Sequence, residues 1–208
     1  MTKQDRTPTH VAELQLEVQG ENHDIQISPE ARLAGSKIKV RDNGGPCSVH
    51  IGAGVTGKWS LSVSGGSKIV IGEKSTCESA MIVAHGADIV IGEDCMFSFS
   101  VEIRATDTHA IYDIDSGDRI NPDKPISIGD HVWLGKQVMI LKGANVGAGS
   151  IIGARAVVSG TVPPLSVAAG VPARIVRQNV VWTRRIGKGR LDLDPAAMAI
   201  VESVRESA

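Results

Sequence analysis

The chain has 208 residues, a net charge of −1, 23 glycines and only 3% aromatic residues. Its length is sufficient for one large hydrophobic core. A charge so close to zero gives no basic field that would attract nucleic acid or an anionic membrane, and no apolar run approaches a membrane span. Cys47, Cys77 and Cys95 have no metal-ligand or redox spacing, so we expect reduced thiols in a cytoplasmic protein.

Residues 1–23 are polar and precede the first repeats, so they are predicted to form an N-terminal cap or a disordered segment. From residue 24 onward the sequence becomes periodic. The segments HIGAG, VIGEK and VIGED place Ile51, Ile71 and Ile91 at intervals of 20 residues. We interpret this interval as a triangular coil of about 18 residues with roughly two extra residues at one corner.

A strict six-residue repeat runs through the second half of the chain. An aliphatic residue recurs at every sixth position, and a small or β-branched residue follows four places later. Neither the helical period nor the strand period produces this spacing. It predicts a parallel β-solenoid whose interior holds both sets, with glycines at the corners, where positive φ angles are often needed. The aliphatic residues are Ile128, Leu134, Ile140, Val146, Ile152 and Val158; the smaller residues are Val132, Val138, Ala144, Ser150, Ala156 and Val162; the glycines are Gly129, Gly135, Gly147 and Gly153.

The polar stretch RATDTHAIYDIDSGDRINPDKP interrupts this regularity. Counting on from Ile91 in steps of six places His109 where a core aliphatic is due, and Asp107 where a small inward residue is due. A carboxylate inside the prism would be costly, so the chain must leave it. The sequence therefore predicts a protruding loop at 105–125, on a face that binds a ligand. Within it, RINP (119–122) is expected to fix the shape of the loop.

The segment PISIGDHVWLGKQVMILKGANVGAGSIIGARAVVSGTVPPLSVAAGVPARIVR, together with MFSFSVEIRATDTHAIYD, resembles the hexapeptide-repeat acetyltransferases of sugars and surface polysaccharides. The resemblance is strong over 50–178 and weaker over 24–50. It implies an all-β chain with a left-handed parallel β-helix over 24–178 and a C-terminal tail over 179–208. It also implies acetyl-CoA as the donor, a carbohydrate acceptor, and a homotrimer with active sites between its subunits. The six histidines form no His-x-x-x-x-His pair, which zinc enzymes of this fold need, so no metal is expected.

Transfer of an acetyl group to a hydroxyl needs a base, and an imidazole is suited to this at neutral pH. The resemblance assigns this role to His109. A base also needs a group that orients its second ring nitrogen, and Asp107, Asp113 and a loop carbonyl all remain candidates. No cysteine or serine has the setting of a nucleophile. We therefore expect direct attack by the acceptor, without an acyl-enzyme.

Trp133 directly precedes a core aliphatic, so it is predicted to project outward from the prism. The resemblance places it at the acetyl and acceptor site. It follows His109 by 24 residues, which corresponds to one coil plus one face when the loop is disregarded. The two residues should therefore meet more easily across a subunit boundary than within one chain. His131, in the same motif, is expected to have a structural role.

Coenzyme A has two kinds of predicted contact. Guanidinium groups suit its phosphates, and backbone amides suit its pantetheine arm. One lysine is either a further phosphate partner or a solvated edge residue. These residues are Arg174 and Arg177 for the phosphates, Gly135, Gly153 and Ala154 for the pantetheine groove, and Lys142 as the lysine.

One feature departs from the family pattern. Where the family often has Thr-Lys after the last repeat, this chain has Ser159 and Gly160, so the contact to the 3′-phosphate is unassigned and Lys188 or Arg190 becomes a candidate.

The prediction is an O-acetyltransferase acting on a sugar or a cell-surface polysaccharide. The alternatives are N-acetylation of an amino sugar or nucleotide sugar, and a β-helix scaffold without catalysis.

The tail is predicted to end in a short helix over 195–206. Asp194 is suited to be its N-cap and Pro195 its first residue. Trp182 is expected to be a packing residue.

Overall fold

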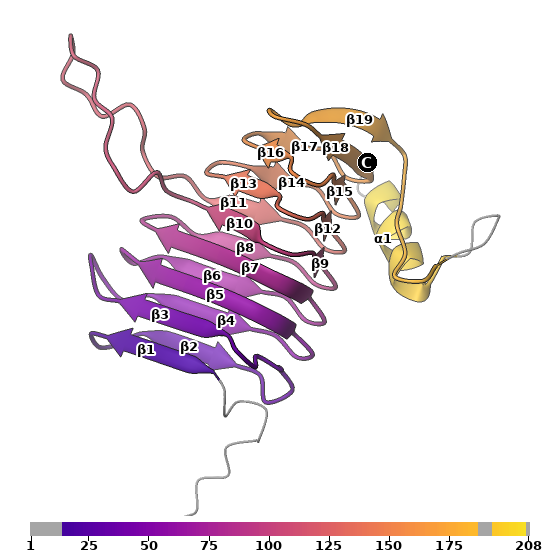
Figure 1. The fold of residues 1–208 in the computed structure, drawn as a ribbon, viewed down its shortest axis with the longest axis horizontal. Coiled ribbons are helices and arrows are strands. Elements are labelled where there is room, and N and C mark those ends of the chain that lie inside the picture. Colours follow the sequence, from indigo (N-terminus) through magenta and orange to yellow (C-terminus); the bar gives the residue numbers. More distant parts are fainter. Residues whose placement is uncertain (1–13, 187–192, 207–208) are drawn as a thin grey trace, which may run out of the picture.

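The computed structural model describes residues 14–186 and 193–206. Strands stack along a triangular prism, one turn above another, so that successive turns build up its three faces (Figure 1). The predicted parallel β-helix is confirmed. Of the strand pairs described, all are parallel except that of the last two strands. The first face is a seven-stranded sheet made of β2 (Asp24–Ile27), β4 (Ser48–Ile51), β6 (Lys68–Ile71), β8 (Ile89–Ile91), β11 (Ile126–Ile128), β14 (Asn145–Val146) and β17 (Thr161–Val162).

A 12-stranded sheet forms the other two faces. In the N-terminal turns, two long strands cross both of these faces without a break, and in later turns each is replaced by two short strands. The second face ends with a strand that reverses direction. The strands that cross both faces are β5 (Thr56–Ser64) and β7 (Thr76–His85). The second face also holds β9 (Met96–Phe97), β12 (Trp133–Leu134), β15 (Ile151–Ile152), β18 (Ser166–Ala169) and β19 (Arg174–Gln178). The third face also holds β1 (Gln15–Gln19), β3 (Lys37–Arg41), β10 (Val101–Arg104), β13 (Met139–Leu141) and β16 (Val157–Val158).

The interior of the prism contains the residues that the six-residue repeat predicts. All six aliphatic positions and all six small or β-branched positions are buried. Phe97 and Ile103, which continue the count from Ile91, are also buried. Burial of this apolar column in every turn stabilises the stack, because each turn covers the aliphatic residues of the next.

The glycines of the repeat have a different role from the predicted one. Gly135 and Gly147 do not have positive φ angles. A Cβ atom on Gly135 would lie 2.7 Å from the nitrogen of Ala154 in the next turn, and one on Gly147 would lie 2.3 Å from that of Pro164. These glycines are therefore needed for close approach between turns. The positive φ angles at these corners belong to other positions, which are residues with side chains, such as His131 and Gln137, or further glycines, Gly143 and Gly149.

Both ends of the described chain add to the prism. β1 begins at Gln15 and pairs with β3, so the strand stack starts before residue 24. The predicted helix is present as α1 (Pro195–Glu206), and the Asp194 side chain caps it by accepting a hydrogen bond from the Ala197 amide at 2.9 Å. Lys188 and Arg190 lie outside the described residues. None of the helices in the described ranges has the length and apolar character needed to cross a membrane.

Candidate functional site

The corners between the faces form three edges along the prism. The loop edge, between the third and first faces, includes the loop 105–125. The tail edge, between the first and second faces, includes residues 129–132. The glycine edge, between the second and third faces, includes residues 135–138 and 153–156. Figure 1 shows the loop leaving one side of the prism, whereas α1 and the chain leading to it lie on the opposite side.

The loop closes at its base and extends as a narrow hairpin. The Lys124 amide donates to the Ala105 carbonyl at 3.1 Å, which joins the two ends of the loop. Further out, the Ile120 amide donates to the Ile111 carbonyl at 2.9 Å. The tip is wholly exposed and includes Ile114, whose exposed fraction is 98%. The loop is thus fixed at its base and presents its far end to solvent or to another molecule.

Asn121 holds the base of the loop together. Its side chain is buried and uses both polar atoms. Nδ2 donates to Asp107 Oδ2 at 2.8 Å and to the His109 carbonyl at 2.9 Å, while Oδ1 accepts from the Ile111 amide at 2.6 Å. The side chain therefore fixes the backbone on both sides of His109. Sequence reasoning did not single out Asn121; the available signal was the Asn-Pro pair in RINP, a pair typical of loops shaped by local hydrogen bonds.

His109 is exposed at the mouth of the loop. Its amide donates to the Asp107 carbonyl at 2.7 Å, whereas its ring makes no hydrogen bond with any residue in 14–186 or 193–206. The Asp107 carboxylate instead accepts from Lys142 Nζ at 2.5 Å. Hydrogen bonds from Lys142 and Asn121 lower the pKa of Asp107 below its ordinary value. The backbone around His109 is thus fixed while both ring nitrogens remain available.

The other predicted orienting group is also engaged elsewhere. Asp113 Oδ1 accepts hydrogen bonds from the Asp115 and Ser116 amides at 3.0 and 2.8 Å, and these bonds lower the pKa of Asp113. It shapes the turn at the tip of the loop. Within one chain, therefore, neither Asp107 nor Asp113 bonds the His109 ring.

Trp133 lies on β12, beside the tail edge and away from the loop (Figure 1). Its exposed fraction is 38%, so the indole projects outward as predicted. Met96 and Ile151 are its partners on the adjacent strands. The structure does not bring His109 and Trp133 together within one chain. A site that uses both would draw them from different subunits.

The predicted cofactor residues fall into two groups. Gly135, Gly153 and Ala154 lie in register on the glycine edge, and the Ala173 amide donates to the Val157 carbonyl at 2.8 Å, which brings the start of β19 beside this edge. Arg174 and Arg177 on β19 are exposed, so their guanidinium groups are accessible. The Gly135 and Gly153 amides donate to Ile152 and Ala168 in the next turn, so these two amides are not free. Lys142 is on the loop edge, where Asp107 pairs with its charge.

The buried cysteines have no features of a nucleophile. Burial raises the pKa of Cys77 and of Cys95 to about 12, so at neutral pH both remain thiols. His131 is buried and bonded on both ring nitrogens, in agreement with the structural role expected of it. The ranges that the structure describes hold no cluster of three or more His, Cys, Asp or Glu residues placed to hold a metal ion.

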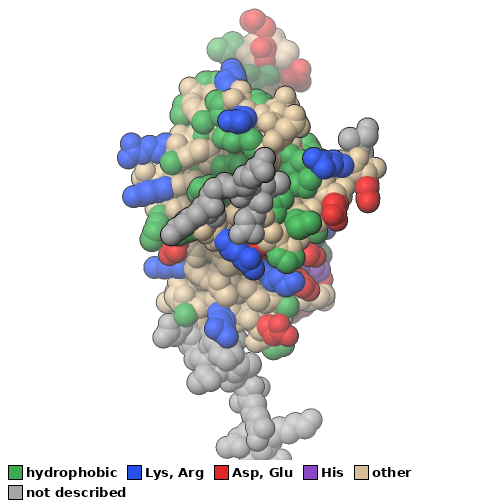
Figure 2. Space-filling model, turned by 90° about the vertical axis from the view of Figure 1, so that its right-hand side faces the viewer, with side chains coloured by type: hydrophobic (Ala, Val, Ile, Leu, Met, Phe, Trp, Pro, Cys, Tyr) green, Lys and Arg blue, Asp and Glu red, His purple; other side chains and the backbone are tan. Residues whose placement is uncertain are grey.

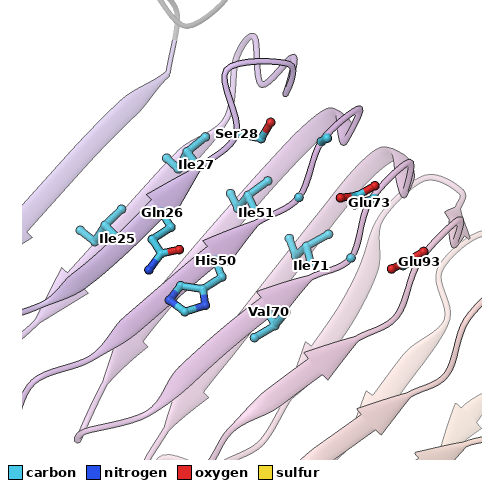
Figure 3. A pocket seen from close by; sticks show the side chains of 13 residues that line it. Ile25, Gln26, Ile27, Ser28, His50, Ile51, Val70, Ile71, Glu73 and Glu93 are labelled. Carbon is cyan, nitrogen blue, oxygen red and sulfur yellow. The ribbon is translucent and has the colours of Figure 1, made fainter.

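A groove of about 670 Å³ lies elsewhere, over β2, β4 and β6 in the N-terminal turns (Figure 3). His50 and Val70 project from the strands on one side of it, and Glu73 and Glu93 lie at the turns on the other side. None of the predicted catalytic or cofactor residues lines this groove. We therefore do not take this groove as the candidate active site, although it is large.

Comparison with known proteins identifies the family. The model of the bacterial transferase hexapeptide (six repeats) matches residues 125–160. The chain is 35% identical over 195 residues to a polysialic acid O-acetyltransferase of Neisseria meningitidis, covering 87% of this chain and 85% of that protein. It is 37% identical over 120 residues to a polysialic acid O-acetyltransferase of Escherichia coli O1:K1 / APEC, covering 57% of this chain but only 39% of that protein. The crystal structure of the polySia-specific acetyltransferase NeuO matches with a TM-score of 0.79 and 28% identity, over 92% of this chain and 97% of that one. The chain belongs to the hexapeptide-repeat acetyltransferases.

Proposed function

We propose that this protein transfers an acetyl group from acetyl-CoA to a hydroxyl of a cell-surface polysaccharide, by direct attack of that hydroxyl on the thioester. The two relatives named above carry the activity in their names, which supports an acetylated carbohydrate acceptor. His109 takes the proton of the acceptor hydroxyl as that oxygen bonds to the acetyl carbon, the C–S bond of the thioester breaks, and the protonated His109 gives the proton to the sulfur, so that coenzyme A leaves as the thiol. Because acetyl-CoA is an intracellular metabolite, the reaction takes place in the cytoplasm.

The observation that carries the proposal is the way the loop presents His109. A general base must reach the proton of its substrate, and the ring nitrogen that accepts this proton must be available. Asn121 fixes the backbone at His109 and Ile111, while the ring itself has no partner in the described chain. Asp107 acts through the backbone and through Lys142 rather than by bonding the ring.

The site is completed by a second subunit of a homotrimer. His109 and Trp133 lie on different edges of one prism, so each subunit supplies one of the two residues to a shared cleft. Trp133 shapes the acetyl and acceptor site in this cleft. Coenzyme A lies along the glycine edge beside Gly135, Gly153 and Ala154, with Arg174 and Arg177 near its phosphates. These assignments rest on the family resemblance and on the shared location of the residues.

The test is release of coenzyme A from acetyl-CoA, measured with a panel of neutral oligosaccharides, oligosialic acids and amino sugars. We expect turnover with a hydroxyl acceptor, and His109→Ala should lower kcat by about 10²- to 10⁴-fold. His50→Asn is a matched control, because His50 lies on β4, near the other end of the prism, and pairs with Asp24. Acetylation of amino sugars alone would contradict the O-transfer, and full activity of His109→Ala would exclude His109 as the base.

A further inference from the structure

The C-terminal tail returns to the prism next to Trp133. Trp182 is buried there, and its ring stacks on His131 at 4.1 Å and 12°. Its indole nitrogen donates to the His131 carbonyl at 2.7 Å, and its own carbonyl lies 3.1 Å from His131 Nε2. The Trp133 ring meets Trp182 at 6.0 Å with an interplanar angle of 48°, a tilted geometry that is favourable for aromatic pairs. The tail thus contacts the Trp133 side chain on one side, through Trp182.

Arg184 fastens this part of the tail to the prism. Its guanidinium donates to Asp94 Oδ1 at 2.8 Å, to Thr76 Oγ1 at 3.1 Å, and to the carbonyls of Asp94 and Cys95 at 3.1 Å. It also lies 5.6 Å from the centre of the Trp182 ring. Four acceptors for one guanidinium group make a specific anchor, because a planar fork must be oriented to reach them all.

A second anchor lies just beyond the first. Thr183 Oγ1 donates to Asp194 Oδ2, which also accepts from the Arg184 amide at 3.2 Å. Asp194 is the cap of α1, so the helix and the tail are joined through one carboxylate. We call residues Trp182–Arg184 the tail clip. Figure 2 views the side of the molecule on which the tail lies, where apolar side chains are exposed between basic ones.

We propose that the tail clip is part of the wall of the acetyl and acceptor site, and that Trp182 and Arg184 are positioning residues that hold the Trp133 indole in its reactive orientation. This rests on the proposed function, which places Trp133 in that site. Trp133 is 38% exposed, so its strand alone does not confine its side chain. Trp182 contacts it from the tail edge, and Arg184 prevents Trp182 from moving away. The open part of the indole then faces the ligand.

The proposal predicts an effect transmitted over two residues. Arg184 has no ring or hydrogen-bond contact with Trp133 among the described residues, yet its loss should free Trp182 and, through it, Trp133. A displacement of about 1 Å in a residue that positions substrate can cost up to about 10²-fold in rate. For a side chain that is loosened rather than removed, we expect Arg184→Ala to lower kcat by about 5- to 20-fold, with KM for acetyl-CoA within about twofold of wild type.

The experiment combines kinetics with a signal from Trp133 itself. The chain has three tryptophans, so fluorotryptophan labelling gives three ¹⁹F resonances, assigned with Trp59→Phe, Trp133→Phe and Trp182→Phe. Arg184→Ala should shift or broaden the Trp133 resonance in the absence of any ligand. Arg185→Ala is the matched control, because Arg185 is adjacent and exposed, and within the described residues its hydrogen bond is made through its backbone amide. Arg184→Lys should restore part of the wild-type behaviour, since one ammonium group cannot reach all four acceptors.

Each outcome is decisive. A changed Trp133 resonance together with a lower kcat supports the proposal. An unchanged resonance in Arg184→Ala, or a changed resonance with kcat equal to that of Arg185→Ala, overturns it. If the wild-type protein turned over no acceptor, the proposed function would fail, while the ¹⁹F signal would still decide whether the clip holds Trp133. Trp182→Phe keeps an aromatic ring but loses the donor to His131, so it should give an intermediate effect in a chain that still folds.

Discussion

The loop and the tail both leave the prism, but they are attached in opposite ways. The loop is held at its base, by the buried amide of Asn121, the ion pair of Lys142 with Asp107 and the bond between the Lys124 amide and the Ala105 carbonyl, and its tip is exposed. The tail is attached through its side chains, with Trp182 buried and Arg184 bonded to four acceptors. The loop therefore fixes a backbone and leaves a side chain free, whereas the tail fixes side chains.

This difference matches what a base and an aromatic wall require. A base must take a proton from the substrate, so the ring nitrogen that accepts this proton has to be free before the substrate binds. An aromatic side chain that lines a binding site must keep one orientation, and for Trp133 the packing against the Trp182 ring provides this. The two attachments can be broken independently, because they lie on different edges of the prism.

Asn121→Ala should give the largest effect on the loop. It leaves the His109 carbonyl and the Ile111 amide without a partner and removes one of the two side-chain donors to Asp107. We expect kcat to fall by about 10²-fold, because the base is no longer placed. The folded prism should lose only about 1–3 kcal/mol. Asn145→Ala, an exposed asparagine on β14, is the control, and steady-state kinetics with thermal melting are the measurements. A kcat of Asn121→Ala within twofold of wild type would show that the Asn121 side chain does not position His109.

Lys142→Ala should have a smaller effect and would separate the two roles of this lysine. If Lys142 supports the loop through Asp107, kcat falls by about 10-fold and KM for acetyl-CoA stays constant. If it binds a phosphate of coenzyme A instead, KM for acetyl-CoA rises and kcat is retained. The paired charge favours the first outcome. Lys58→Ala on β5 controls for the loss of a surface charge.

The smallest expected effect is on the attachment of the tail at low pH, where protonation of Asp94 should weaken it. Burial by itself would raise the pKa of Asp94, but hydrogen bonds from His131 and Arg184 outweigh burial and lower it. A lowered folded pKa stabilises the tail at every pH above the ordinary aspartate pKa of about 3.9, and this stabilisation is lost as pH falls below that value. The wild-type melting temperature should therefore decline more steeply between about pH 5 and 3 than that of Asp94→Asn. Parallel curves for the two proteins would contradict this role of Asp94.

The regular part of the structure could be predicted from the sequence, and the irregular attachments could not. Ile128 and Val132 are buried because residues six positions apart occupy equivalent places on successive faces of the prism, so that each set points inward on every face. His109 and Asp107 do not fit these inward positions, and they therefore marked where the chain had to leave the prism. The partners of Asn121 come from three separated positions in a loop without a period, and spacing carries no information about them. The contact of Trp182 with Trp133 likewise depends on the path of a non-repetitive tail.

The corners also show why local patterns can mislead. Glycine after four of the six aliphatic residues suggested positive φ angles, but Gly135 is required because Ala154 of the next turn lies too close for a Cβ atom. This contact joins two turns, so it is a property of the stack rather than of one corner. A repeat reveals that turns are alike, but it does not reveal how tightly they stack.

The reversal of the last strand has a consequence for self-association. The terminal turns of a parallel β-helix carry unpaired backbone groups that can receive another strand, and uncovered edges of this kind invite copies to join end to end. β19 turns back and pairs antiparallel with β18, from Ser166 opposite Gln178 to Ala169 opposite Arg174. The other two faces end in β16 and β17, each only two residues long and so a poor template. The C-terminal end of the prism is thus protected against fibre-like growth, and the strand that protects it also carries Arg174 and Arg177, the two arginines proposed to bind coenzyme A.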